Sequence, residues 1–340
     1  MKKALYFEIL NYKKENLDLL YDNFEVIRLN NPSMITPDIL KDVSVIFAPL
    51  GYFLGEDIFS MSPNLKVVAT NTTGVPHIDV ERAEARDIRV FSLKDERKFL
   101  NTITPTAELT MGLIINITRN VIPAIKSVTD GKWSRWEFGG QAMLSRMSLG
   151  IVGLGRLGKM VARYADAFGM KVSYYDPFIT HSELPPLCPP LVRGGWGGIK
   201  DEWNYRRTDT VEELVSDVDM VSVHIPMNEE NRHFFNKAVF SKFKKGSYFI
   251  NTARGEIVDS QALIEALEKG IIRGAALDVL DGEFEPSFSD RALSHPLVKH
   301  AQTHDNLIIT PHIAGSTEDA WYLTQRHVIE QTIEYMRRFQ

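Results

Sequence analysis

Cysteine is nearly absent from this sequence, since Cys188 is the only one among 340 residues. One cysteine cannot form a disulfide within the chain, and no cysteine–histidine group has the spacing of a zinc site. No uninterrupted apolar run approaches the roughly 18 residues of a membrane span. The first apolar stretch is interrupted at Glu8, too early for a signal peptide. These absences predict a soluble, cytoplasmic protein with no metal site and no membrane partner.

An excess of basic charge is also missing. The chain has 39 Lys and Arg against 44 Asp and Glu, a formal charge of −5, so no basic field predicts a nucleic-acid partner. Hydrophobic residues make up 44% and charged residues 24%, which are ordinary globular values. At 340 residues the chain is too long for one hydrophobic core, and two domains are expected.

Short apolar segments alternate with amphipathic helical segments along the chain. The predicted strands are Lys3–Leu10, Glu25–Leu29, Ser44–Ala48, Leu65–Thr70 and Ile88–Ser92, then Ser148–Val152, Lys171–Tyr175, Met220–His224, Ser247–Asn251, Gly274–Asp278 and Asn306–Thr310. This alternation is typical of βαβ units. It predicts an α/β fold with two doubly wound parallel-sheet domains.

Two helices and one irregular segment stand out. Pro105–Arg119 is apolar almost all round, which predicts burial between domains or subunits. The last helix, Ser316–Arg338, is expected to begin with Ser316 and Asp319 in capping-box spacing. The Pro- and Gly-rich segment 183–198 fits neither a helix nor a strand. We interpret it as a surface insertion, with a lid over the cofactor as the alternative.

A glycine motif follows strand Ser148–Val152. Gly153, Gly155 and Gly158 have G-x-G-x-x-G spacing, and an amphipathic helix follows them. Such glycines allow a tight turn, close approach to a pyrophosphate and helix–strand packing, while the helix N-terminus offers free N–H groups. Asp176 follows the next strand, 23 positions after Gly153. The motif predicts a dinucleotide-binding unit.

The position of Asp176 favours NAD over NADP as the cofactor. Its carboxylate can accept hydrogen bonds from both adenosine ribose hydroxyls and would repel a 2′-phosphate. Arg206 and Arg207, further along the chain, could instead bind that phosphate and keep NADP open.

Chemically active side chains follow the later strands. Arg254 lies after strand Ser247–Asn251, Asp278 ends the next strand, and Glu283 and His312 follow in order. Ligands bind at the carboxyl ends of parallel strands, so these residues are candidates for a catalytic site.

The order of these motifs resembles the D-isomer-specific 2-hydroxyacid dehydrogenase family. Asn251-x-x-Arg254-Gly255, Asp278-Val-x-x-x-Glu283 and Pro311-His312-Ile313-x-Gly315 follow the glycine motif, with 29 positions from Arg254 to Glu283 and again from Glu283 to His312. The resemblance implies a Rossmann NAD-binding domain at 104–312 and a flavodoxin-like substrate domain at 1–103 and 313–340. Catalysis would occur in the cleft between them.

The resemblance also implies roles for the strand-end residues. His312 would be the acid–base, suited to gaining and losing a proton near neutral pH. Glu283 would pair with its imidazole, although Glu285 is a rival. Arg254 would bind the substrate carboxylate and polarise the carbonyl group. Asp278 would orient the nicotinamide carboxamide.

Further contacts are implied on both sides of the site. The implied cofactor contacts are Gly153, Leu154, Gly155, Arg156, Leu157, Gly158, Asp176, His224, Pro226, Thr252, Ala253, Arg254, Asp278 and His312. The implied substrate contacts are Thr73, Gly74, Val75 and Arg254. Pro76 and His77 depart from the family pattern at this loop. Leu50, Gly51, Tyr52 and Phe53 should also face the cleft and bring no cation, which argues against a phosphorylated substrate.

The implied function is NAD-dependent interconversion of a D-2-hydroxy acid and its 2-oxo acid. A phosphoglycerate dehydrogenase is the alternative within the family, although the end of the chain at Gln340 leaves no room for a regulatory domain. An NAD-sensing corepressor-like binding protein is the alternative of another class. A homodimer is expected from the family and from the apolar helix Pro105–Arg119.

Overall fold

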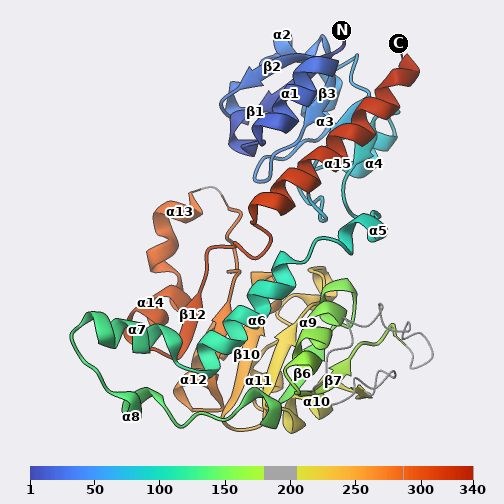
Figure 1. Ribbon diagram of the computed structural model, residues 1–340. Helices are drawn as coiled ribbons and strands as arrows, with labels where there is room; N and C mark the ends of the chain where they lie inside the picture. The colour runs from blue at the N-terminus through green and yellow to red at the C-terminus, as the bar shows by residue number, and fades with distance from the viewer. Residues whose placement is uncertain (180–204, 286, 340) are drawn as a thin grey trace, which may run out of the picture. The chain divides into compact units, whose positions relative to one another are not determined.

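The computed structural model describes residues 1–179, 205–285 and 287–339. Contacts divide the chain into two compact units (Figure 1). Unit 1 is Met1–Ile103, Phe284–Pro286 and Ser316–Gln340, and unit 2 is Thr104–Glu283 and Ser287–Gly315. The predicted insertion at 183–198 lies outside the described residues.

Unit 1 is built on a parallel five-stranded sheet of order β2-β1-β3-β4-β5. Its strands are β1 (Lys3–Phe7), β2 (Glu25–Leu29), β3 (Val43–Phe47), β4 (Val67–Ala69) and β5 (Arg89–Phe91). Neighbouring side chains of β3 enter opposite cores: Val45 and Phe47 pack on one face, and Ile46 packs on the other. Both faces are therefore covered, as expected for a parallel sheet.

Helices cover both faces of this sheet. On one face, α1 (Lys14–Asn23) packs beside α15 (Glu318–Met336), with Leu20, Val328 and Ile329 fully buried. On the other face lie α2 (Pro37–Leu40), α3 (Glu56–Ser60) and α4 (Val80–Glu84). The short helix α5 (Arg97–Leu100) follows β5. The C-terminal helix is thus part of the core of unit 1.

Unit 2 contains a parallel seven-stranded sheet of order β12-β11-β10-β9-β6-β7-β8. Its strands are β6 (Ser148–Val152), β7 (Lys171–Tyr175), β8 (Arg206–Arg207), β9 (Met220–Val223), β10 (Ser247–Asn251), β11 (Ile272–Leu277) and β12 (Leu307–Ile309). The order reverses between β9 and β6, where ligands bind in open α/β sheets. The two parallel sheets confirm the predicted α/β, doubly wound fold.

The sheet of unit 2 also has a core on each face. One core contains α6 (Pro105–Thr118) and α9 (Arg156–Ala167). The other contains α10 (Val211–Asp217), α11 (Lys237–Phe240), α12 (Ser260–Glu268) and α14 (Pro296–Thr303), with Phe235, Phe240 and Phe249 in contact. The remaining helices are α7 (Val121–Thr129), α8 (Arg135–Phe138) and α13 (Phe288–Arg291).

Apart from differences in strand bounds, the structure differs from the sequence-based expectation in three elements. Helix α6 was expected to be buried between domains or subunits, but most of its apolar side chains pack against β10, β11 and α9 of its own unit. The last helix begins at Glu318, because the Thr317 side chain accepts a hydrogen bond from the N–H of Ala320, so Thr317 rather than Ser316 is the cap. Strand β8 was not predicted, because two arginines carry no strand pattern.

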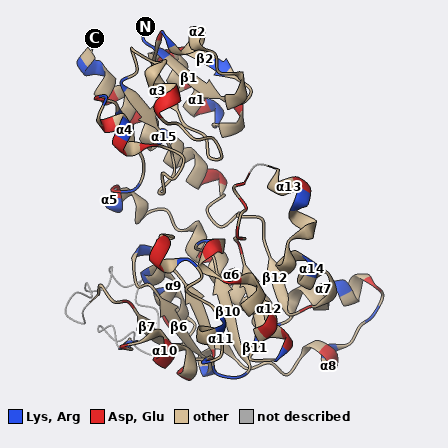
Figure 2. Ribbon diagram, turned by 180° about the vertical axis from the view of Figure 1, so that it is seen from behind, with Lys and Arg blue, Asp and Glu red and all other residues tan. Residues whose placement is uncertain are grey.

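Charged side chains of both signs are interspersed over each unit (Figure 2). Among the described residues, no helix combines the length and the apolar character needed to cross a membrane.

Candidate functional site

The turn between β6 and α9 is formed by the predicted glycines. Gly153 has φ +91°, and a Cβ there would lie 2.8 Å from the His224 carbonyl oxygen. A Cβ on Gly158 would lie 2.1 Å from the Gly153 carbonyl oxygen. Side chains at these two positions would therefore push the helix away from the strand end.

Gly155 is different, because apart from its chain neighbours no atom of the described residues lies within 4 Å of the position that a Cβ would take. It is the N-cap of α9, and because glycine has no side chain, the first turn of the helix receives no side-chain cap hydrogen bond from it. An open approach to uncapped N–H groups is what a pyrophosphate requires. The residues present therefore fit a dinucleotide.

Asp176 is fixed at the end of β7. Its Oδ2 accepts a hydrogen bond from the N–H of Leu154 at 2.8 Å, and its Oδ1 accepts one from Phe178 N–H at 2.9 Å. The residue is only 8% exposed. The glycine turn and the predicted ribose-binding carboxylate are thus joined directly.

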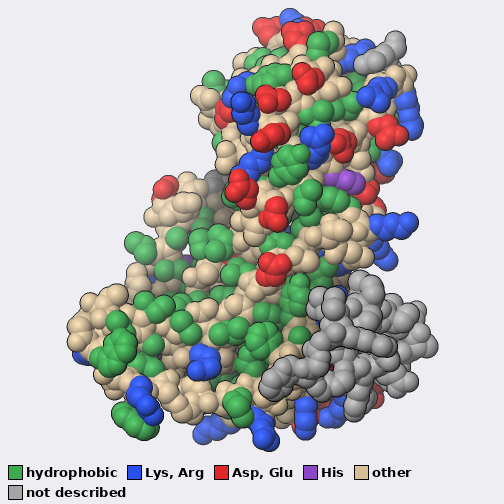
Figure 3. Space-filling model, in the orientation of Figure 1, with side chains coloured by type: hydrophobic (Ala, Val, Ile, Leu, Met, Phe, Trp, Pro, Cys, Tyr) green, Lys and Arg blue, Asp and Glu red, His purple; other side chains and the backbone are tan. Residues whose placement is uncertain are grey.

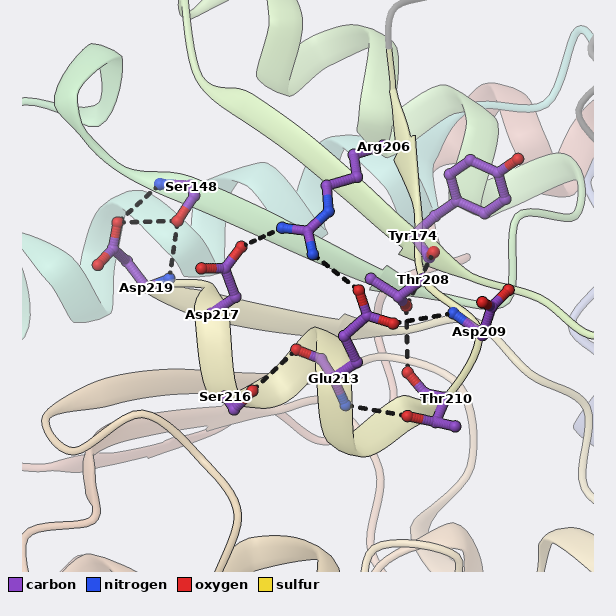
Figure 4. Close-up of polar contacts among 10 residues, drawn as sticks. All are labelled: Ser148, Tyr174, Arg206, Thr208, Asp209, Thr210, Glu213, Ser216, Asp217 and Asp219. Carbon is purple, nitrogen blue, oxygen red and sulfur yellow. Dashed lines mark hydrogen bonds and ion pairs between the residues drawn. The ribbon is translucent and has the colours of Figure 1, made fainter.

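Arg206 is already paired on both arms of its guanidinium group (Figure 4). Its NH1 donates to Oδ2 of Asp217 at 2.6 Å and its NH2 to Oε1 of Glu213 at 2.7 Å. This pairing reduces the availability of Arg206 for a 2′-phosphate. It therefore weighs against the NADP alternative.

Four predicted cofactor contacts follow the ends of β9 and β10. Nε2 of His224 lies 2.9 Å from the Ser222 hydroxyl, and burial lowers the pKa of His224 to about 4, so the ring is neutral at pH 7. The Thr252 hydroxyl lies 2.9 Å from that of Thr110 on α6. The N–H of Ala253 donates to Oδ1 of Asn251 at 2.9 Å. Pro226 is exposed, two residues after His224.

The loop that carries Arg254 is packed tightly against the loop after β11. A Cβ on Gly255 would lie 2.0 Å from the carbonyl carbon of Leu280, so this position admits only glycine. The Asn251 amide donates to the Arg254 carbonyl oxygen at 2.8 Å, and NH1 of Arg254 donates to the Ala253 carbonyl oxygen at 2.6 Å. Arg254 is thus presented on a fixed backbone.

Asp278 anchors the loop of His312, a role that sequence reasoning missed. Its carboxylate, fully buried, accepts hydrogen bonds from the N–H groups of Ile313 at 2.9 Å and Ala314 at 2.7 Å, and from the Thr310 hydroxyl. The N–H of His312 donates to the Asp278 carbonyl oxygen at 2.8 Å. These bonds help to hold His312 at φ +52°, a left-handed conformation uncommon for a side-chain-bearing residue.

His312 and Glu283 are brought together although they follow different strands. Nδ1 of His312 lies 2.8 Å from Oε1 of Glu283. The Glu283 side chain is 11% exposed, and that of His312 is 34% exposed. A carboxylate only accepts, so Nδ1–H donates, and Nε2 is the ring nitrogen that could exchange a proton with a ligand.

The predicted substrate loop belongs to unit 1. Thr73 is exposed, and Gly74 and Val75 are partly buried. The carbonyl groups of Thr72 and Val75 accept from Leu93 and Ile78. Among the described residues, no hydrogen bond is donated by the N–H groups of Thr73, Gly74 or Val75. The carbonyl groups of this loop are thus used within the protein, and its N–H groups can donate hydrogen bonds to an anion.

Other clusters do not compete with this site. Among the described residues, no three His, Cys, Asp or Glu side chains are grouped so that they could hold a metal ion. In unit 2, Arg254, Glu283 and His312 lie on the loops that follow the adjacent strands β10, β11 and β12, and the structure brings Glu283 to His312.

Comparison with known proteins agrees with this arrangement. The model of the D-isomer specific 2-hydroxyacid dehydrogenase NAD binding domain matches residues 111–314. The chain belongs to the D-isomer specific 2-hydroxyacid dehydrogenase family. The match confirms the resemblance and identifies NAD as the cofactor of the domain that carries the glycine turn.

Relatives extend the family match along the chain. A hydroxypyruvate reductase of Thermotoga maritima is 30% identical over 321 residues, covering 94% of this chain and 90% of the relative. A D-3-phosphoglycerate dehydrogenase of Bacillus subtilis is 35% identical over 282 residues, which is 83% of this chain. The aligned region spans only 47% of that relative's length.

A solved structure shares the whole fold. The D-lactate dehydrogenase of Aquifex aeolicus, complexed with NAD and lactic acid, is 26% identical with a TM-score of 0.77. The match covers 99% of this chain and 95% of that one. Both sheets described above are therefore family features.

Proposed function

We propose that the protein is an NAD-dependent dehydrogenase that interconverts a D-2-hydroxy acid and its 2-oxo acid. The observation that carries the proposal is the 2.8 Å contact between His312 Nδ1 and Glu283 Oε1 in a unit whose glycine turn fits a dinucleotide. This contact fixes a proton-exchanging nitrogen near the carboxyl ends of the strands, where ligands bind.

His312 is proposed as the acid–base residue. In reduction of the 2-oxo acid, Nε2–H of the imidazolium donates a proton to the oxo oxygen, and in oxidation the neutral ring removes it from the hydroxyl group. Glu283 keeps the second proton at Nδ1 and stabilises the imidazolium. NAD supplies the hydride acceptor or donor.

Arg254 is proposed to bind the substrate carboxylate and polarise the neighbouring carbonyl group. A guanidinium group can make two parallel hydrogen bonds to a carboxylate, which fixes orientation as well as charge. The close contact at Gly255 and the Asn251 hydrogen bond hold the backbone of this loop. The N–H groups of Thr73, Gly74 and Val75 in unit 1 are proposed as further substrate contacts.

The residues proposed to hold NAD are those around the glycine turn and the strand ends. Gly153, Leu154, Gly155, Arg156, Leu157 and Gly158 would surround the pyrophosphate, and Asp176 would accept from the ribose. His224, Pro226, Thr252 and Ala253 would line the same region. Asp278 and His312 would lie at the nicotinamide end, although both Asp278 oxygens already accept hydrogen bonds from the 310–314 loop.

The test is NADH oxidation with a panel of 2-oxo acids. The panel holds glyoxylate, pyruvate, hydroxypyruvate, phosphohydroxypyruvate, and branched and aromatic 2-oxo acids. We expect the protein to turn over at least one unphosphorylated member of the panel. In His312→Gln the turnover should fall roughly 10²- to 10⁴-fold, while the affinity for NADH stays unchanged. Binding of NADH without turnover of any member would contradict it and favour a corepressor-like role.

Phosphoglycerate dehydrogenase remains the second candidate because relatives with that name are 35% and 34% identical to this chain. Leu50–Phe53, which ought to face the substrate, provide no cation for a phosphate. The panel separates the two candidates, since a phosphoglycerate dehydrogenase would prefer phosphohydroxypyruvate.

A homodimer is also proposed, formed through α7. Ile122, Ile125 and Val128 on this helix are 47%, 59% and 49% exposed, and Trp133 and Trp136 beyond it are more than 80% exposed. Figure 3 shows hydrophobic side chains on this part of unit 2. The exposed apolar side chains of α7 and the two tryptophans lie on one continuous segment of the chain and form one apolar patch. In a dimer with a twofold axis, each copy can cover the patch of the other.

Sedimentation measurements test the dimer. Ile125→Glu should yield monomers, whereas Lys126→Glu, an exposed neighbour on the same helix, should leave the dimer intact. A monomeric parent protein would contradict the proposal. A cytoplasmic location is proposed as well, and the single cysteine of the sequence supports it.

A further inference from the structure

A buried histidine lies beside the proposed substrate loop of unit 1. His77 is 5% exposed and Thr70, at the end of β4, is 1% exposed. Between these two buried residues, Thr73 and Pro76 of the loop are exposed to solvent. The loop therefore has an accessible tip and a buried base.

Three side chains at this base form a continuous chain of hydrogen bonds. Nε2 of His77 lies 3.3 Å from Oγ1 of Thr70. Oγ1 of Thr70 lies 3.0 Å from Oγ1 of Thr72. The Thr72 hydroxyl donates to the Gly74 carbonyl oxygen at 2.6 Å. The chain ends in the backbone of the loop itself.

The direction of every bond in this chain follows from its last member. A carbonyl oxygen only accepts, so Thr72 donates its single hydroxyl proton to Gly74. Thr70 must then donate to Thr72, and its own proton is used as well. His77 must therefore donate from Nε2–H, which makes the Nε2–H tautomer the one that completes the chain.

The state of the His77 ring agrees with this requirement. Burial lowers the pKa of His77 to about 4, so the ring is neutral at pH 7 and carries one proton. Nδ1 is buried and has no hydrogen-bond partner among the described residues. The bond from Nε2 is therefore the polar interaction that this side chain contributes.

The backbone of His77 holds a second loop. Its carbonyl oxygen accepts from Leu54 N–H at 2.8 Å, and the Leu54 carbonyl accepts from Asp79 N–H at 2.9 Å. Leu54 directly follows Leu50–Phe53, the other segment expected to face the substrate. One residue thus ties together both loops of unit 1 that are expected to contact the ligand.

We propose that His77 is a positioning residue for the substrate carboxylate, acting through Thr70 and Thr72 on the Gly74 carbonyl. In a trans peptide the carbonyl and the following N–H point in opposite directions. Holding the Gly74 carbonyl against Thr72 therefore aims the Val75 N–H away from the protein, toward an anion. This inference rests on the proposed function of the loop.

The kinetic test compares variants that break the chain with variants that preserve it. Thr72→Val removes the hydroxyl with little change of shape, and Thr72→Ser keeps it. We expect Thr72→Val to raise KM for the best 2-oxo acid about two- to tenfold, as the loss of one hydrogen bond would, with kcat and NADH affinity little changed. Thr72→Ser should behave like the parent. His77→Leu should resemble Thr72→Val, and His77→Gln, whose amide can donate, should recover part of the loss.

A matched control separates positioning from stability. Asn16 is fully buried in the same unit, where its amide donates to the Tyr322 carbonyl oxygen at 2.9 Å, away from the loop. Asn16→Ala should lower the Tm without raising KM. If Asn16→Ala raises KM as much as Thr72→Val does, or if Thr72→Val leaves KM unchanged, the positioning role is wrong.

A second measurement does not depend on activity. Nitrogen-15 NMR of labelled histidine, assigned with His77→Gln, should show His77 as the neutral Nε2–H tautomer between pH 5.5 and 8. An Nδ1–H tautomer would overturn the hydrogen-bond chain even if the protein is an active dehydrogenase. Conversely, an Nε2–H tautomer with no turnover of any 2-oxo acid would contradict the proposed function and leave the chain of bonds standing.

Discussion

Oε1 of Glu283 accepts a hydrogen bond from Nδ1 of His312 at 2.8 Å, while Asp278 holds the backbone of that histidine and of the two residues after it. Asp278 thus fixes the loop that carries His312, and Glu283 fixes the orientation of its ring. The N–H of Leu280 contacts Oε2 of Glu283 at 3.4 Å, which steadies the carboxylate in turn. A ring fixed at Nδ1 presents Nε2 in a single orientation.

Glu283→Gln should move the pH profile of reduction. The neutral amide carries no charge that could stabilise the imidazolium. Reduction needs the protonated ring, and the alkaline limb of kcat/KM should therefore shift to lower pH. Glu285→Gln is the matched control and should leave the limb in place. A limb that moves only in Glu285→Gln would assign the partner role to the other carboxylate.

Arg254→Lys should weaken binding of the 2-oxo acid although the charge is kept. An ammonium group cannot make the two parallel hydrogen bonds of a guanidinium group. We expect a higher KM for the oxo acid and a lower kcat, with the dissociation constant of NADH nearly unchanged. Steady-state kinetics together with fluorescence titration of NADH measure the two effects. Unchanged kinetics would remove Arg254 from the proposed site.

Gly255→Ala should damage the site and the fold together. The added Cβ would lie 2.0 Å from the carbonyl carbon of Leu280, so the Arg254 loop and the loop of Glu283 must separate. Overpacking of this kind costs about 1–3 kcal/mol. Gly112→Ala on α6 is the control, because outside the local backbone of its own helix no atom of the described residues lies within 4 Å of its Cβ position. Thermal unfolding should show a clear loss of Tm for Gly255→Ala and none for Gly112→Ala.

Much of the fold follows from local sequence pattern. Ser148–Val152, Lys171–Tyr175 and Ser247–Asn251 have in the structure the bounds that their apolar runs predict. Buried strands of parallel sheets carry continuous apolar runs, so their ends are marked by the first polar or glycine residue. The first strand is predicted too long because apolar Ile9 and Leu10 follow the polar mark at Glu8, and Glu8–Leu10 form a 3-10 turn.

The candidate site, too, could be predicted only in part from the sequence. Motif spacing pointed to Arg254, Glu283 and His312, and the structure brings Glu283 to His312. Sequence could not show that the Asp278 carboxylate is occupied by the 310–314 loop, or that Thr70, Thr72 and His77 are linked. Those relations depend on side-chain contacts across loops, which leave no periodic signal. Gly255 could have been noticed from the Arg-Gly pair, since glycine after a functional residue suggests close backbone approach.

Asp176→Asn should narrow the preference for NADH over NADPH. The asparagine side chain keeps one oxygen, which can still accept from one of the two backbone N–H groups that Asp176 binds, but it has no negative charge. Loss of that charge beside a 2′-phosphate is worth on the order of 1 kcal/mol, or about fivefold in the kcat/KM ratio. Asp209→Asn, an acidic residue at the start of the neighbouring helix, is the control. Equal use of both cofactors by the parent protein would contradict the role given to Asp176.

Stability in mildly acidic solution should depend on His77. Burial lowers the pKa of His77 from 6.5 to about 4 in the folded state. Between these values the unfolded chain binds a proton that the folded chain does not, so the free energy of unfolding falls as the pH decreases from 6.5 to 4. We expect this group to lower the free energy of unfolding by about 2 kcal/mol between pH 7 and pH 5. Urea unfolding at pH 7 and pH 5, followed through unit 1, measures it. His77→Gln cannot titrate, so its unfolding midpoint should change less between the two pH values than that of the parent. An equal change in both proteins would show that His77 is not the group responsible.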